Sequence, residues 1–147
     1  MQTIKTIAIS LALLACGTGA MAADSTSQVI KRQAPSGINA SFYTCIDKAG
    51  SDTVATSACL SAEKKAQDTR LNTTYKALLA KLNGKAKDGL VSAERAWLDF
   101  HNKSGNLEAA LYGDETVADL QVTQNEIFRL CERANTLDKY LSIANDQ

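Results

Sequence analysis

Apolar side chains recur at helical spacing through most of the chain. Between residues 57 and 83, Leu71, Tyr75, Leu78 and Leu82 are spaced i, i+4, i+7 and i+11, which places them in one stripe along a helix. No stretch alternates apolar and polar residues, as a strand with one buried face would. The hydrophobic pattern therefore predicts an all-α protein.

The same spacing and the residues suited to cap helices predict four helices, over residues 39–49, 57–83, 88–104 and 115–144. Glycines at positions 50, 84 and 105 follow the first three, and a short helical turn is expected over 107–112. The apolar side of the third helix consists of Leu90, Ala93, Trp97 and Phe100, which are expected to be buried. Short connections then predict a small antiparallel bundle of three to four helices, forming one domain over residues 39–147.

Residues 1–22 have the features of a secretory signal peptide. Lys5 precedes an apolar run over 7–15, and Ala20-Met21-Ala22 is a small-x-small cleavage site. An alternative is a lipobox at Leu13-Leu14-Ala15-Cys16, which would make the protein an outer-membrane lipoprotein anchored through Cys16. Residues 23–38 are polar, contain the only proline, and are predicted to be a flexible linker.

Export and charge restrict the classes of partner. The apolar run of the signal peptide is shorter than the ~20 residues of a membrane span, and no later run is longer, so no membrane span is predicted. A signal peptide predicts a periplasmic or secreted protein. The chain has 16 basic and 16 acidic residues. This balance gives no basic face for nucleic acid, so nucleic-acid binding is not expected.

Export also makes disulfides possible, because the compartment outside the cytoplasm is oxidising. The segment after the signal peptide contains Cys45, Cys59 and Cys131. A Cys45–Cys59 bond would join the first helix to the second and leave Cys131 as a buried thiol. The rival pairing is Cys59–Cys131, which would require the second and fourth helices to be adjacent. The sequence favours the first pairing because the two early cysteines close a short loop.

No group of residues in the sequence forms a recognisable catalytic, cofactor-binding or metal-binding motif. His101 is the only histidine and is predicted to lie on a helix surface. The carboxylate pairs Glu63/Asp68 and Glu94/Asp99 are spaced i, i+5, about 140° apart around a helix, and are predicted to be solvated. The sequence therefore indicates no enzyme, no cofactor and no metal.

Two runs of residues carry a family resemblance. One is Asp-x-x-Leu-Asn-x-x-Tyr over residues 68–75, and the other is Ala-x-Arg-Ala-Trp over residues 93–97. At this separation, behind a signal peptide and a pair of cysteines, they resemble the LprI-type lysozyme-inhibitor family of small exported bacterial proteins and lipoproteins. The resemblance covers roughly residues 40 to 141. The family-motif residues are Asp68, Leu71, Asn72, Tyr75 and Trp97.

The chain also departs from the family pattern. Where the family commonly continues after the Trp helix with Arg-Asp and a further cysteine, this sequence has His101, Asn102 and Gly105. Cys131 is the remaining candidate for the late family cysteine, so the family's usual second disulfide is not expected here.

The resemblance implies an envelope or periplasmic binding protein whose partner is a protein, namely a lysozyme-type cell-wall hydrolase that it inhibits. It assigns no inhibitory residues. Two alternatives remain at this point: a periplasmic immunity protein against a delivered toxin, and a passive envelope protein.

Overall fold

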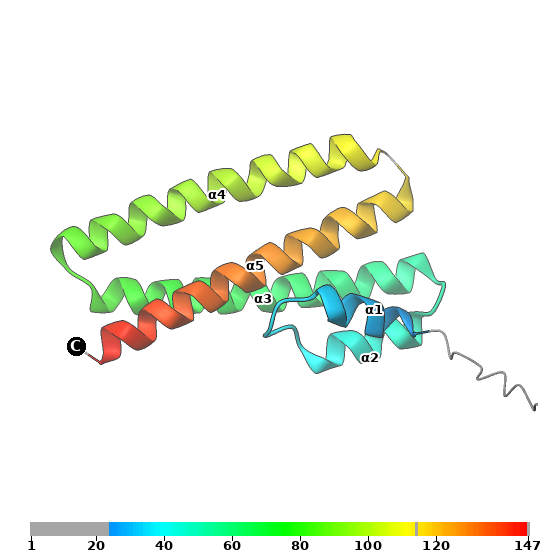
Figure 1. Ribbon diagram of the computed structural model, residues 1–147, viewed down its shortest axis with the longest axis horizontal. Helices are drawn as coiled ribbons and strands as arrows, with labels where there is room; N and C mark the ends of the chain where they lie inside the picture. Colours follow the sequence, from blue (N-terminus) through cyan, green and yellow to red (C-terminus); the bar gives the residue numbers. More distant parts are fainter. Residues whose placement is uncertain (1–23, 114, 147) are drawn as a thin grey trace, which may run out of the picture.

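The computed structural model describes residues 24–113 and 115–146, and this part of the chain contains five α-helices and no strand (Figure 1). The helices are α1 (Thr26–Gln33), α2 (Ala40–Ala49), α3 (Thr53–Lys81), α4 (Gly84–Tyr112) and α5 (Thr116–Asn145). The predicted signal peptide and Cys16 lie outside the described residues. The all-α prediction is confirmed, but the helix count is five rather than three to four.

The three long helices form the body of the molecule, with α5 in contact with both α3 and α4. Consecutive long helices run in opposite directions, and α1 and α2 lie beside the first half of α3 (Figure 1). The α2 helix packs against α3, and α1 packs against α2. This order makes α5 the central helix and leaves α4 at the edge of the body.

The prediction of a flexible linker over residues 23–38 is wrong for its first half, because α1 lies there. Ser25 caps α1 in a capping box with Gln28. The Ser27 hydroxyl donates to Asp47 of α2 at 2.7 Å, and Ile30 packs against the core around α2. The helix depends on these contacts with α2, which the polar composition of the segment does not reveal.

Three helix bounds also differ from prediction, and one of them is the start of α4, which lies at Gly84 rather than near residue 88. The α3 helix begins at Thr53 rather than near residue 57, because the Asp52 carboxylate accepts from the backbone N–H of Val54 and Ala55 at 2.9 and 3.0 Å. The α4 helix does not end at Gly105 but continues to Tyr112. A glycine inside a helix costs only about 1 kcal/mol relative to alanine, which packing against α5 readily offsets.

The apolar core has two parts. The first lies between α3, α4 and α5 and contains the predicted stripe; its buried members are Leu71, Leu78, Leu90, Leu130, Ala134 and Leu137. The second lies between α2, α3 and α5; its buried members are Phe42, Ile46, Cys59, Leu60 and Ile127. The helical periodicity thus identified Leu71, Leu78 and Leu90 of the first cluster correctly.

The structure contains the predicted Cys45–Cys59 disulfide, which joins α2 to α3 across a Cα–Cα distance of 5.8 Å. Cys131 is a free thiol, fully buried on α5. Burial raises the pKa of the Cys131 thiol, although the neighbouring Arg70 guanidinium acts in the opposite direction. Both its burial and its raised pKa make this thiol unreactive in the folded protein.

We therefore expect a thiol reagent to leave Cys131 unmodified in the native protein and to modify it in denaturant without reductant. Cys45 and Cys59 should be labelled only after reduction. Peptide mapping by mass spectrometry checks each position. A label on Cys45 before reduction would contradict the disulfide assignment.

Candidate functional site

A groove of about 450 Å³ runs between α3 and α4, with α5 at its base. We refer to it as the α3–α4 groove. From α3 it is lined by Lys64, Asp68, Leu71, Asn72 and Tyr75. From α4 it is lined by Val91, Glu94, Arg95, Trp97, Leu98, His101 and Asn102, and from α5 by Glu126 and Leu130. The wall is therefore a mixture of apolar, amide and charged side chains.

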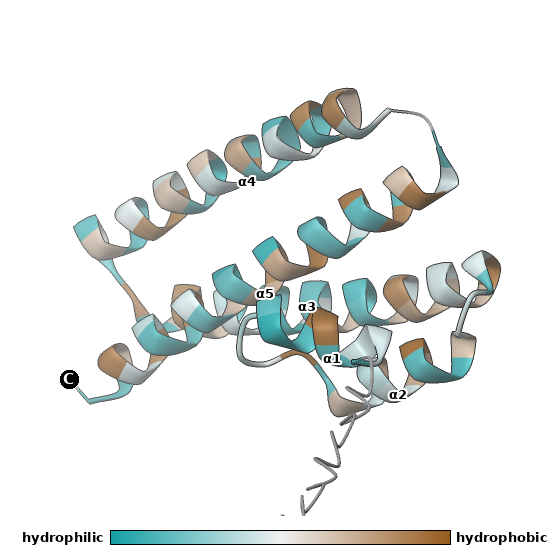
Figure 2. Ribbon diagram, turned by 45° about the vertical axis from the view of Figure 1, so that its right-hand side comes forward, coloured by the Kyte–Doolittle hydropathy of each residue, from teal (hydrophilic) through white to brown (hydrophobic). Residues whose placement is uncertain are grey.

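All five family-motif residues line this groove, although they come from two helices. Asp68 and Asn72 are exposed, Leu71 belongs to the core, and Tyr75 is half-buried against that core. Trp97, predicted to be buried, is half-buried instead. Figure 2 shows hydrophilic and hydrophobic residues mixed along both helices. Sequence reasoning thus selected residues that the fold brings together, but it could not show that they share a groove.

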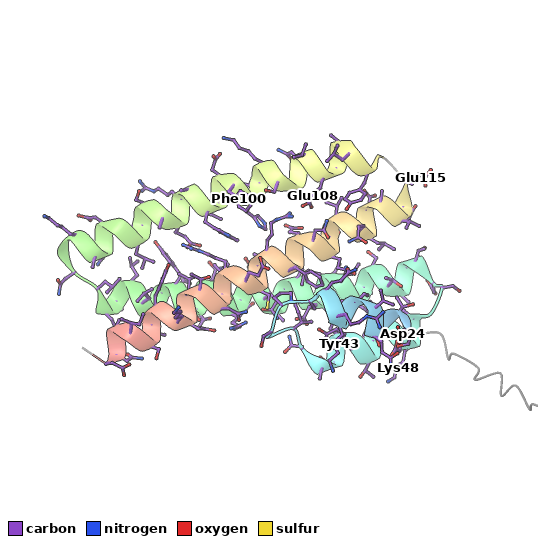
Figure 3. The ribbon with its side chains drawn as sticks, viewed as in Figure 1. Asp24, Tyr43, Lys48, Phe100, Glu108 and Glu115 are labelled. Carbon is purple, nitrogen blue, oxygen red and sulfur yellow. A yellow bond between two sulfur atoms is a disulfide. The ribbon has the colours of Figure 1, made fainter. Side chains whose placement is uncertain are left out.

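A row of polar pairs, which we call the polar seam, joins α4 to α5. Its α4 members, Glu94, His101 and Glu108, are spaced seven residues apart and therefore face the same neighbour. Their partners on α5 are Arg133, Glu126 and Arg129. Figure 3 labels Glu108, which pairs with Arg129 where α4 and α5 run side by side.

The first pair of the polar seam is a buried ion pair. The Arg133 Nε and Nη2 atoms donate to Glu94 Oε2 at 2.9 and 2.7 Å, and both side chains are about nine-tenths buried. The Arg133 guanidinium also lies 5.8 Å from the Trp97 ring centroid. The Trp97 ring is therefore positioned by the same arginine that neutralises Glu94.

The second pair corrects the prediction for the histidine. His101 is only 9% exposed, its ring lies 4.8 Å from that of Trp97, and its Nε2 is 3.4 Å from Glu126 Oε1. Glu94, predicted to be solvated, is 6% exposed. The apolar pattern of α4 could not reveal that His101 and Glu94 are buried. Their burial is tolerated because α5 supplies their polar partners.

Of the four carboxylates predicted to be solvated, Asp68 and Asp99 are exposed, whereas Glu63 is buried like Glu94 and holds the segment before α2. It accepts from the backbone N–H of Asn39 at 3.0 Å and from the Asn39 side chain at 2.9 Å. The neighbouring Gln67 donates to Gly37 O at 2.9 Å, and Asn135 of α5 donates to Ser36 O at 2.7 Å. Residues 36–39 are thus fixed by polar side chains of both α3 and α5.

Beside this segment, Arg70 of α3 pairs with Asp138 of α5, and Thr74 donates to Asp138 at 2.7 Å. Partial burial acts to raise the pKa of Asp138, but the hydrogen bonds from Thr74 and Arg70 and the charge of Arg70 lower it on balance. The carboxylate is therefore held in its charged form as a partner of Arg70.

A second surface lies on the outer side of α4. Phe100, Leu107 and Leu111 are 57%, 59% and 74% exposed, and their spacing of i, i+7 and i+11 puts them in one line. The exposed Ala93 and Ala96 extend this line, and we call these five residues the α4 stripe. The prediction that Ala93 and Phe100 are buried is wrong, because α5 contacts α4 on its Glu94 and His101 side instead.

The α4 stripe and the α3–α4 groove lie on opposite sides of the helix. Leu98 and Asn102 line the groove and are each two positions from Phe100, which is about 160° around the helix axis. Contiguous exposed apolar side chains of this kind mark interaction surfaces. One helix thus separates two surfaces of different chemistry.

Both surfaces are suited to non-covalent binding. Among residues 24–113 and 115–146, no three or more His, Cys, Asp or Glu side chains are grouped as metal ligands would be. None of the helices in this part of the chain combines the length and apolar character needed to cross a bilayer.

A family model described as "Lysozyme inhibitor LprI" matches residues 45–139. The match begins at the disulfide in α2, spans all of α3 and α4, and ends within the last two turns of α5. No curated protein and no solved structure matches the chain.

Proposed function

Because the chain belongs to the LprI family of lysozyme inhibitors, we propose that it binds a lysozyme-type cell-wall hydrolase and inhibits it. The observation that carries this proposal is the family match over residues 45–139, which includes all of α3 and α4 and most of α5. The predicted signal peptide and the Cys45–Cys59 disulfide support an exported protein acting in the periplasm or cell envelope.

The α4 stripe is the surface that we assign to this contact. It extends from Ala93 to Leu111, about 27 Å along the helix axis, at 1.5 Å per residue. Protein–protein contacts obtain most of their affinity from a few large apolar or aromatic anchors, and Phe100 with Leu107 would supply them. The polar seam supports this assignment, because it fixes α4 by one side and leaves the stripe turned away from α5.

The test is lysis of cell-wall substrate by several classes of lysozyme, with and without the purified exported protein. We expect the wild-type protein in molar excess to slow at least one lysozyme. The double variant Phe100→Ala/Leu107→Ala should weaken this inhibition by about tenfold or more, because truncating two anchors removes at least about 1.4 kcal/mol of binding free energy.

The control is Val54→Ala/Val117→Ala, which truncates two apolar side chains outside the α4 stripe that are more exposed than Phe100 and Leu107. The inhibitory potency of this control should be within about twofold of the wild-type value. Surface truncations of this kind should barely change the stability of the protein. No inhibition by wild-type protein of any lysozyme class would refute the function and favour the immunity or passive alternatives. Equal inhibition by both double variants would refute the assigned surface only.

A further inference from the structure

We propose that the α3–α4 groove is a binding site for a saccharide, that is, a neutral ligand with many hydroxyl groups. The juxtaposition that points to it is a buried carboxylate oxygen and a buried imidazole nitrogen, both without hydrogen-bond partners, beside two aromatic rings and a rim of amide groups. The family match assigns no ligand to this groove, and the proposal does not depend on inhibition of a hydrolase.

The two unpartnered atoms are on α4. Glu94 Oε1 and His101 Nδ1 have no hydrogen-bond partner among the residues that the structure describes, although both side chains line the groove and are more than nine-tenths buried. A carboxylate oxygen such as Glu94 Oε1 accepts hydrogen bonds and cannot donate them. A ligand that suits this wall must therefore bring hydrogen-bond donors.

The charges around the groove favour a neutral ligand. Lys64 and Arg95 line it, and Arg133 lies behind it, so there are three cations against the carboxylates of Asp68, Glu94 and Glu126. Two of these carboxylates are already paired, Glu94 with Arg133 and Glu126 with Lys64 at 2.7 Å. These six charges cancel, so the groove attracts neither a cation nor an anion by net charge.

The remaining residues suit a sugar ring, which has an apolar face of C–H groups and an edge of hydroxyl groups. Tyr75 and Trp97 offer aromatic surface, and Leu98 adds an aliphatic one. The amides of Asn72 and Asn102 lie at the exposed edge, where they can both donate to and accept from hydroxyl groups. The volume of about 450 Å³ is within the range of small-ligand sites, and such sites combine apolar walls with a few placed polar groups.

Protein atoms cover both unpartnered atoms, so a ligand hydroxyl reaches them only when side chains at the wall of the groove shift locally. A ligand hydroxyl can donate to Glu94 Oε1, and it can either donate to or accept from His101 Nδ1. It would then satisfy a group that is otherwise costly to bury.

Trp97 is the only tryptophan of the chain and lies in the groove, so its fluorescence reports binding there directly. The experiment titrates the exported protein with oligomers of N-acetylglucosamine, with oligomers of glucose, and with a lysine-rich peptide as the cationic probe. We expect a saturable change with at least one saccharide and none with the peptide.

The diagnostic variant is Asp68→Ala/Asn72→Ala, which removes two exposed groups of the groove without touching the core. It should weaken saccharide binding about tenfold, the effect of losing two ordinary hydrogen bonds. His101→Phe, which keeps a ring against Trp97 but removes Nδ1, should weaken it by about fivefold or more. The matched control is Thr69→Ala/Thr73→Ala, which changes the adjacent exposed positions of α3 outside the groove and should bind like wild type.

Three results would overturn the proposal. These are no saturable fluorescence change with either saccharide, a saturable change with the lysine-rich peptide alone, and equal saccharide affinity in the groove variant and its control. None of these results bears on hydrolase inhibition, which is measured separately and was assigned to the opposite side of α4.

Discussion

Replacing Arg133 by methionine is expected to lower the free energy of unfolding by about 3–5 kcal/mol, because it leaves the buried Glu94 carboxylate without its cation. Arg133 makes two hydrogen bonds to Glu94 Oε2, and Glu94 Oε1 already has no partner in the described chain. Glu94 must then either remain charged in a nonpolar setting or take up a proton, and both cost free energy. Urea unfolding followed by circular dichroism measures the loss.

A matched control lies on the same helix. Lys103 pairs with Asp99 at 2.8 Å, but both side chains are largely exposed. Lys103→Met should therefore change stability by less than about 1 kcal/mol. The double variant Glu94→Leu/Arg133→Met, which removes the whole pair, should recover much of the loss. An Arg133→Met protein as stable as the Lys103→Met protein would show that Glu94 is not buried as described.

Gly37→Ala should lower the free energy of unfolding by about 2–4 kcal/mol. Gly37 has a φ of +106°, which L-residues rarely adopt and which costs a side chain about 1–3 kcal/mol. An added Cβ would also lie 2.7 Å from Arg70 Nη1 and 3.3 Å from Cys131 Sγ. Displacing Arg70 weakens its pair with Asp138, so the substitution disturbs the segment that α3 and α5 hold together.

Gly89→Ala is the control for this substitution. Gly89 lies in the helical backbone of α4, is exposed, and has open space where a Cβ would project. Alanine there should stabilise the protein by up to about 1 kcal/mol, because it restricts the unfolded chain and favours the helix. In thermal and urea unfolding, the change in the free energy of unfolding should thus be negative for Gly37→Ala and positive for Gly89→Ala. A neutral Gly37→Ala would show that residues 36–39 can adopt another backbone path.

The orientation of α4 connects the stability predictions to the two proposed binding surfaces. The polar seam turns the Glu94 and His101 side toward α5, which directs Leu98 and Asn102 into the α3–α4 groove and leaves Phe100 in solvent. A helix held by an ordinary apolar stripe would have buried Phe100 instead. The choice of polar contacts over apolar ones therefore decides which residues are available to a partner.

The sequence by itself determined the helical class, the stripe of α3 and the Cys45–Cys59 pairing. These depend on features that are local or nearly so: the 3.6-residue period around Leu71 and Leu78, and a loop short enough to close at little entropic cost. It also selected Asp68, Asn72 and Trp97, through their resemblance to a family. The sequence could not predict that these residues meet in one groove, because this depends on how α3 and α4 are placed about α5.

Only the tertiary structure decided the burial of Glu63, Glu94 and His101, and the exposure of Phe100. A charged residue is predicted to be solvated unless its partner is known, and here the partners lie 24 to 39 residues away along the chain. The α1 helix was missed for the same reason, since Ser27 is fixed by Asp47 rather than by an apolar stripe. The apolar pattern of a helix indicates which of its faces can be buried, and it can be seen in the sequence of that helix alone. Burial of a polar or charged side chain depends on a partner from another helix, which that pattern does not identify.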